Sequence, residues 1–208
     1  MGVTVVANPK GGVGKSTIAT NLAGYLARQG LAVALGDVDR QQSARLWLSL
    51  RPASLPPIQL WEAEPEDVVK LPKSAQAGVL DTPAGLSGKR LDAVMKRADR
   101  VLVPLQPSLF DIYATRDFLA EVMARRKHAQ VPVAVVANRV REHTLSADQL
   151  RHFLAEVGVT VAGELRDTQN YVQLAAHGLS LWDVAAGRVT RDLAQWDPVL
   201  AWLKPATA

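Results

Sequence analysis

Two lysines bracket a run of glycines near the start of the chain, in the segment NPKGGVGKSTIATNLA, residues 8–23. Backbone with so few side chains can curl its N–H groups around phosphate oxygens, and a helix following it presents its positive N-terminal end to the same anion. Lys15 would then reach the terminal phosphates of a nucleotide, and the Ser16 hydroxyl would bind Mg²⁺. Pro9 stands where the strict phosphate-loop pattern has its first glycine, so the loop is the variant K-G-G-x-G-K-[ST]. A second lysine, Lys10, is more than the general pattern requires.

Carboxylates follow two further apolar segments. LGDVDRQQSARLW, residues 35–47, carries Asp37 and Asp39 one residue apart. In GVLDTPAG, residues 78–85, a short apolar run ends at Asp81, the arrangement that holds Mg²⁺ directly or through a water in many nucleotide sites. A hard cation and a polarised water both require oxygen ligands. The three aspartates are therefore candidates for holding Mg²⁺ and positioning a water beside bound phosphate.

Strand-sized apolar runs alternate with segments of helical period along the chain. We expect strands at 3–8, 32–37, 78–81, 100–105 and 131–138, a first helix that Gly30 ends, and helices near 42–50, 88–97, 110–127, 146–157, 169–177 and 190–203. Nearly continuous apolar strands are typical of a parallel sheet that is covered on both faces. The pattern predicts an α/β fold with a doubly wound, mainly parallel sheet and helices on both faces. Ligands of such sheets bind at the carboxyl ends of the strands, where the glycines and aspartates fall.

Composition limits the class of protein. With 208 residues, 48% of them hydrophobic, the chain is long enough for one substantial core and short for two, so we expect a single domain over residues 1–208. Its apolar runs are much shorter than the roughly 20 residues that cross a bilayer. The chain has no cysteine, which excludes cysteine-ligated iron–sulfur clusters and agrees with a cytoplasmic location. The net charge of +4 is compatible with contact to polyanions and equally with a solvated basic surface.

The segment KGGVGKST resembles the deviant Walker A motif of the ParA/MinD ATPases, which are P-loop proteins. The resemblance implies an Mg²⁺-dependent ATPase in which Lys10 crosses to the partner subunit and contacts its nucleotide, so that ATP closes a sandwich homodimer. A cation supplied in this way neutralises phosphate charge and makes the ligand part of the interface. The catalytic residues implied are Lys10, Lys15 and Asp39.

Further segments are similar to the same family. The D-x-D-P-Q-x-S likeness of residues 35–47 implies that Asp39 orients the attacking water and that Asp37 supports either the Mg²⁺ shell or the loop, although Arg40 replaces the usual proline. In VVANRV the resemblance implies that Asn138 reads the adenine edge, and asparagine is also a common turn former at strand ends. The implied nucleotide contacts are Lys10, Gly11, Gly12, Val13, Gly14, Lys15, Ser16, Thr17 and Asn138, and the implied metal-binding residues are Ser16, Asp37 and Asp81.

Residues 101–115 and 165–183 extend the resemblance over most of the chain, which looks most like the small ParA partition ATPases that lack an N-terminal helix-turn-helix. This implies an ATP-bound dimer that binds DNA non-specifically, associates with the nucleoid, and partitions or positions a plasmid, chromosome or protein cargo. A ParB-like or other adaptor would stimulate hydrolysis. Candidates for contact with DNA phosphates are Arg151, Arg188 and Arg191, the last two on one helical face if the helix extends that far. Each arginine could equally be a solvated surface residue.

The alternative function is that of a MinD-like ATPase acting at a membrane or on a protein partner. Membrane docking would need a C-terminal amphipathic helix with a basic face. The tail, residues 191–208, is rich in apolar residues but contains Pro198 and a single late cation, Lys204, so we expect it to pack on the core. Residues 51–76 are rich in proline and weakly patterned, and an adaptor could dock there or along 110–127.

Overall fold

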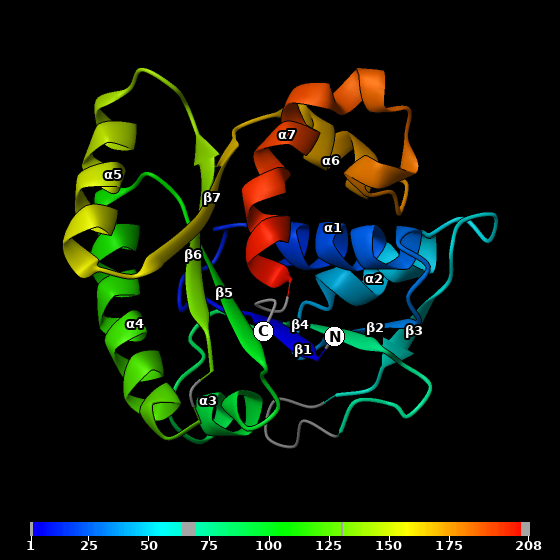
Figure 1. Ribbon diagram of the computed structural model, residues 1–208, viewed down its shortest axis with the longest axis horizontal. Helices are drawn as coiled ribbons and strands as arrows, with labels where there is room; N and C mark the ends of the chain where they lie inside the picture. Colours follow the sequence, from blue (N-terminus) through cyan, green and yellow to red (C-terminus); the bar gives the residue numbers. More distant parts are fainter. Residues whose placement is uncertain (1, 64–69, 130, 205–208) are drawn as a thin grey trace.

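The computed structural model describes residues 2–63, 70–129 and 131–204 (Figure 1). Within these ranges, seven parallel strands form one sheet in the order β3-β2-β4-β1-β5-β6-β7. The strands are β1 (Val3–Val6), β2 (Val33–Asp37), β3 (Ile58–Trp61), β4 (Ala77–Asp81), β5 (Arg100–Leu105), β6 (Val133–Val140) and β7 (Thr160–Arg166). β1 therefore lies at the centre of the sheet, and all the carboxyl ends point to the same edge.

Helices cover both faces of this sheet (Figure 1). They are α1 (Lys15–Arg28), α2 (Ser43–Leu50), α3 (Gly88–Met95), α4 (Leu109–Ala129), α5 (Leu145–Val157), α6 (Gln169–Ala175), the 3₁₀ turn η1 (Leu181–Asp183) and α7 (Ala186–Leu203). One hydrophobic cluster joins the sheet to α1, α2, α6 and α7, and the other joins it to α3, α4 and α5. The predicted doubly wound α/β fold is confirmed.

The sequence patterns missed the two outer strands, β3 and β7. Both lie at edges of the sheet, and their buried, half-buried and exposed side chains are mixed and do not form a continuous apolar run. β3 has only four residues and lies inside the proline-rich stretch 51–76. Residues 64–69 of that stretch, part of one predicted adaptor site, lie outside the described residues.

The C-terminal helix α7 packs on the sheet, as expected from the sequence. Trp196 is fully buried and its indole nitrogen donates a hydrogen bond to the Tyr171 hydroxyl at 3.0 Å. Gly163 of β7 permits this close packing, because a Cβ atom there would lie 2.7 Å from Cγ2 of Val199. The helix is kinked at Val189, whose φ of −132° and ψ of 19° are not helical.

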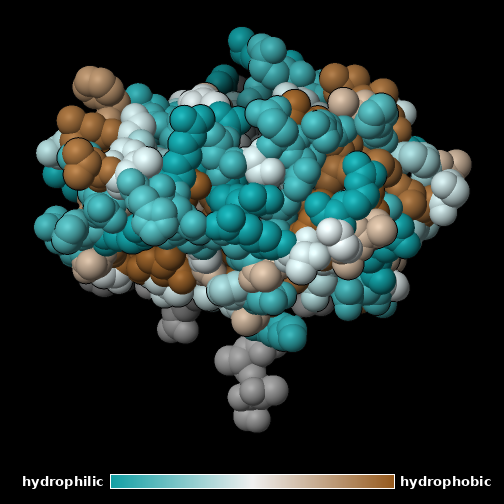
Figure 2. All heavy atoms as spheres, turned by 90° about the horizontal axis from the view of Figure 1, so that it is seen from above, coloured by the Kyte–Doolittle hydropathy of each residue, from teal (hydrophilic) through white to brown (hydrophobic). Residues whose placement is uncertain are grey.

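Trp196, Val199 and Leu203 of the tail are thus buried inside the protein. In the view of Figure 2, hydrophilic side chains occupy the centre of the visible face and separate several smaller hydrophobic patches. Among the described helices, none has the length and apolar character needed to cross a membrane.

A buried carboxylate, Asp183, ties η1 to two other helices. It accepts hydrogen bonds from Arg51 at 2.8 and 3.2 Å, from Arg28 at 2.9 Å, and from the Ser180 hydroxyl at 2.6 Å. Burial alone would raise the pKa of the Asp183 carboxyl, but the bonds from Arg51 and Ser180 hold that pKa below its ordinary value. This cluster fixes the segment between α6 and α7 against α1 and the end of α2.

Replacing Asp183 with alanine should destabilise the fold by about 3–5 kcal/mol, because the buried Arg51 guanidinium loses its carboxylate partner and keeps only backbone carbonyls. Urea unfolding followed by circular dichroism measures the change. Glu142→Ala, which breaks the exposed pair between Glu142 and Arg191, should lower the free energy of unfolding far less, because water and salt screen a surface ion pair. Equal losses in the two variants would contradict this account of the cluster.

Candidate nucleotide-binding site

The glycine-rich loop follows β1 and leads directly into α1. Gly12 and Gly14 have φ angles of 79° and 95°, in the left-handed region that glycine adopts without strain. A Cβ atom on Gly14 would also lie 2.2 Å from the amide nitrogen of Asn138. That amide donates to the Val13 carbonyl at 2.8 Å, so the end of β6 holds the loop in place. The loop leaves its N–H groups and the positive end of α1 facing one site.

Lys15, the first residue of α1, places a buried cation beside the loop. Its ammonium group donates to the Lys10 carbonyl at 2.7 Å, which closes the loop around the site. Burial lowers the pKa of the Lys15 ammonium group, while the nearby carboxylates of Asp81 and Asp39 raise it. A buried amine with carboxylates nearby is well placed to bind a multiply charged anion that arrives with its own cation.

Asp81 is a carboxylate that the fold buries beside the phosphate loop. It ends β4, lies in register with Val6 of β1 and Asp37 of β2, and is fully buried. Neither carboxylate oxygen has a hydrogen-bond partner among the described residues. Burial raises the pKa of Asp81 to about 7, against the opposing effects of the Ser16 hydroxyl and Lys15. An unpartnered buried carboxylate beside a hydroxyl fits a divalent cation, which prefers oxygen ligands.

The described residues contain no group of three or more His, Cys, Asp or Glu side chains arranged to hold a metal ion by themselves. A nucleotide site does not need one, since phosphate oxygens and waters complete the coordination of Mg²⁺. Asp81 and Ser16 are the protein oxygens that suit this role.

The Asp37 carboxylate is engaged by the turn that follows β2. One of its oxygens accepts a hydrogen bond from the Asp39 backbone at 2.9 Å, and the other accepts from Ala44 at 2.8 Å and Arg45 at 3.2 Å. Burial raises the pKa of Asp37, although these backbone bonds oppose the rise. These bonds support the predicted role in the loop, because they shape the turn after β2 and the start of α2. A contribution of Asp37 to the Mg²⁺ shell stays a prediction.

Asp39 reaches the same cavity as the phosphate loop. This cavity has a volume of about 670 Å³, and its walls include Lys15, Ser16, Asp39 and Arg40. One Asp39 oxygen accepts a hydrogen bond from the Gln41 backbone at 3.0 Å, which fixes the turn despite the absence of the usual proline. The side chain is half-buried and faces a space that a water and a terminal phosphate can share.

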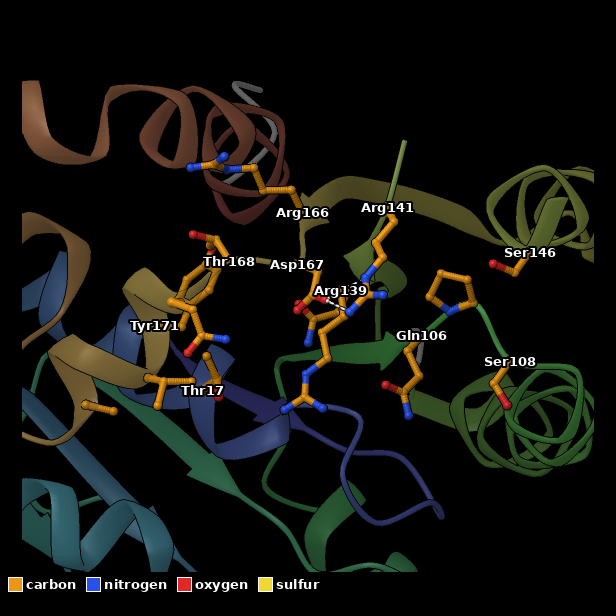
Figure 3. A pocket seen from close by; sticks show the side chains of 15 residues that line it. Thr17, Gln106, Ser108, Arg139, Arg141, Ser146, Arg166, Asp167, Thr168 and Tyr171 are labelled. Carbon is orange, nitrogen blue, oxygen red and sulfur yellow. Dashed lines mark hydrogen bonds and ion pairs between the residues drawn. The ribbon is translucent and has the colours of Figure 1, made fainter. Parts of the chain in front are cut away.

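A second cavity, of about 870 Å³, adjoins the first (Figure 3). It lies among the ends of β5, β6 and β7 and the start of α6, and Asn138 forms part of its wall. Thr17 and Arg139 line both cavities, so the two spaces meet at these residues. The combined groove can accommodate phosphates on the α1 side and a base with its sugar beyond them.

The comparisons with known proteins agree with this geometry. The sequence matches the CobQ/CobB/MinD/ParA nucleotide binding domain over residues 4–181. The chain belongs to this family. It is 27% identical over 195 residues to the maintenance of carboxysome distribution protein A of Halothiobacillus neapolitanus, covering 90% of each chain. It is 28% identical over 170 residues to protein ParA of Rhizobium radiobacter, covering 77% of this chain and 76% of that relative.

The fold is shared with solved members of the same family. An ATP complex of Cyanothece McdA is 17% identical and has a TM-score of 0.77, covering 100% of this chain and 99% of that chain. The predicted ParA/MinD resemblance is confirmed, and the protein is a ParA/MinD-family nucleotide-binding ATPase.

The residues expected to contact nucleotide differ in whether they line the phosphate cavity. Those that line the phosphate cavity are Gly11, Gly12, Gly14, Lys15, Ser16 and Thr17. Val13 is buried and offers its carbonyl to Asn138, whose amide therefore has a partner other than adenine. Adenine recognition by Asn138 stays a prediction.

Lys10 lies apart from the cavity that Lys15 serves. Its side chain is 38% exposed, and its ammonium group is 3.9 Å from Asp111 at the start of α4. Asp111 also accepts a hydrogen bond from Gln106 at 2.8 Å. A half-exposed lysine with one loose ion pair is free to reach a neighbouring molecule.

The three arginines predicted to contact DNA are exposed, and two of them have acidic partners. Arg151 pairs with Asp148 and Glu164, and Arg191 pairs with both oxygens of Glu142 at 2.7 Å. Arg188 and Arg191 were expected on one helical face if the helix extended that far, and the kink at Val189 interrupts the helix between them. A role in DNA binding stays a prediction for all three.

Sequence analysis did not single out Arg139, although the structure brings it to both cavities. Its only signal in the sequence was its place directly after Asn138 at the end of a predicted strand.

The raised pKa of the buried Asp81 carboxyl predicts how the free energy of unfolding depends on pH in the absence of nucleotide and Mg²⁺. Its pKa of about 7 lies above its ordinary value of 3.8, so its contribution to stability is complete below about pH 4 and is lost as pH rises through 7. Through this group the wild type should lose up to about 4 kcal/mol of its free energy of unfolding as pH rises, and Asp81→Asn should not show this loss. Urea unfolding between pH 4 and 8 in a chelating buffer tests it, with the exposed Asp148→Asn as control. Parallel curves for Asp81→Asn and the wild type would contradict the assignment.

Proposed function

We propose that the protein is a ParA-like switch that binds ATP with Mg²⁺, dimerises around it, and hydrolyses it slowly to return to the monomer. The observation that carries the proposal is the cavity lined by the phosphate loop, Lys15 and Ser16, beside which Asp81 is buried with no hydrogen-bond partner among the described residues. Each is costly to bury alone, and a Mg²⁺-bound polyphosphate compensates all of them together.

In this mechanism Lys15 exchanges its bond to the Lys10 carbonyl for phosphate oxygens. Asp81 and Ser16 would hold Mg²⁺, which when bound would neutralise charge on the phosphates. Asp39 accepts a hydrogen bond from the attacking water and aligns it with the terminal phosphate. Positioning and charge neutralisation provide most of the rate in such reactions, so slow turnover and a timer function are compatible with these few groups.

Lys10 gives the site its dependence on a second copy of the chain. In a sandwich dimer, the lysine of each subunit would leave Asp111 and bind the phosphates held by the other subunit. ADP lacks the terminal phosphate and would hold the lysine less well. The dimer would therefore form with ATP and separate after hydrolysis.

The output we propose is non-specific DNA binding by the dimer, with an adaptor that stimulates hydrolysis and links the switch to a cargo on the nucleoid. Relatives named for carboxysome distribution and as ParA support a positioning role. The exposed Arg151, Arg188 and Arg191 are the candidate DNA contacts, and the first and last would exchange weak surface ion pairs for phosphates.

Action on a protein partner is a second candidate, and one surface feature favours it. A mainly apolar groove of about 720 Å³ lies between α4 and α5, where Leu109 and Tyr113 are more than half exposed. It overlaps the 110–127 segment predicted for an adaptor. Membrane docking by the tail is less well supported, because Trp196 and its apolar neighbours face the core.

The two lysines should have separable effects. Lys15→Ala should weaken ATP and ADP binding by roughly 10- to 100-fold, since it deletes a charge-assisted bond to phosphate. Lys10→Ala should bind nucleotide at the affinity of an isolated subunit but form no ATP-dependent dimer. Calorimetry and light scattering with a slowly hydrolysed ATP analogue measure both. Normal dimerisation of the Lys10 variant would overturn the role of this lysine in the partner's site.

DNA binding should require the ATP state. A non-specific duplex should be retained with ATP or its analogue, but not with ADP, and raising the salt concentration should weaken retention. Replacing Arg151, Arg188 and Arg191 with alanine should reduce the slope of log affinity against log salt by about one for each phosphate that an arginine no longer neutralises. Arg116→Ala, on α4, is the matched control. ATP-dependent dimers that retain no DNA would redirect the output toward the protein partner.

A further inference from the structure

Arg139 has an unusual backbone conformation at the carboxyl edge of the sheet. Its φ angle is 54°, in the left-handed region that residues with a side chain rarely adopt. The pairing of β6 with β7 is also irregular between Ala137 and Val140, so Arg139 lies where the ladder is interrupted. Bulges of this kind redirect side chains and are frequent beside functional sites. Strained backbone conformations are concentrated at functional sites, so the Arg139 side chain is a candidate for a functional role.

The redirected side chain extends into the groove. In Figure 3, Arg139 runs from the end of β6 toward the start of α1, whereas Arg141 turns toward Asp167. Arg141 bonds Asp167 at 2.8 Å, and Arg166, the third arginine of the larger cavity, bonds the buried Asp192. Within the described part of the chain, no hydrogen bond or ion pair engages the Arg139 side chain, which is exposed. It is the arginine of this cavity whose charge is available to a ligand.

The position of Arg139 between the cavities indicates which part of a ligand it meets. Lys15 and Ser16, which line the smaller cavity, mark the place of the terminal phosphates, and the larger cavity on the far side has room for the base and sugar. The phosphate next to the sugar must lie between them. Thr17 and Arg139 line both spaces and so border this intermediate position.

We propose that the Arg139 guanidinium binds the α-phosphate of the bound nucleotide, an inference that rests on the proposed nucleotide-binding function. The planar guanidinium can donate two parallel hydrogen bonds to one phosphate group, which a lysine cannot do. Because AMP, ADP and ATP all carry this phosphate, Arg139 strengthens the binding of each equally. It anchors the nucleotide in every state of the cycle, while the terminal phosphate alone controls dimerisation.

The test compares the affinities of adenosine, AMP, ADP and a slowly hydrolysed ATP analogue for the wild type and Arg139→Gly, by competition against a fluorescent ADP. Glycine keeps the left-handed backbone without strain and deletes the guanidinium. We expect affinity for all three nucleotides to fall by the same factor, roughly 10- to 100-fold, and affinity for adenosine to stay unchanged. The melting temperature of the nucleotide-free variant should not fall, which separates weaker ligand binding from a weakened fold. Arg139→Lys should recover only part of the affinity, and Arg100→Ala, at the amino end of β5, controls for the removal of one positive charge.

Other outcomes would overturn the inference. An equal reduction for adenosine would mean that the guanidinium contacts the base or sugar, and a reduction confined to the ATP analogue would place it at the terminal phosphate. Unchanged affinities would show that Arg139 contacts no part of the nucleotide. If the wild type bound none of the three nucleotides, the proposed function itself would fail, a result distinct from any change specific to Arg139.

Discussion

The parallel direction of all seven strands is the constraint on which the site depends. It brings the carboxyl ends of β1, β2, β4 and β6 to one edge, so four separate loops converge there. β1 supplies the phosphate loop, β2 supplies Asp39, β4 supplies Asp81 and β6 supplies the Asn138 amide that fixes the loop. None of these segments could assemble the groove alone, and the hydrophobic clusters on both faces of the sheet hold them in place.

The same edge of the sheet also carries groups that reduce the stability of the protein without nucleotide. Asp81 is buried without a hydrogen-bond partner among the described residues, Lys15 is a buried cation, and Arg139 has a left-handed backbone. The Asp183 cluster illustrates the opposite arrangement, in which buried charges are paired within the protein. A site whose charges are compensated only by a ligand couples ligand binding to folding stability and to assembly, which is what a nucleotide switch requires.

Much of this arrangement could be predicted from the sequence, because the signals are local. Continuous apolar runs identified five of the strands, and the glycines, Lys15 and Asp81 occupy the strand ends where a ligand was expected. What the patterns missed depends on tertiary structure. β3 and β7 are edge strands with mixed polarity, the oxygens of Asp37 are engaged by the turn that follows them, and the Val189 kink interrupts the helix between two arginines that spacing alone placed together. Arg139 became visible only through its backbone angle and the interrupted ladder, which no local pattern encodes.

The central claim is that ATP, bound in this groove, is what joins two copies of the chain for a limited time. The most direct measurement is the molar mass of the wild-type protein in solution, followed by light scattering from the addition of ATP and Mg²⁺ until the ATP is consumed. The account predicts that the mass doubles after addition and returns to that of the monomer as ADP accumulates, and that ADP alone has no effect. A mass that stays constant while ATP is bound and hydrolysed would contradict it.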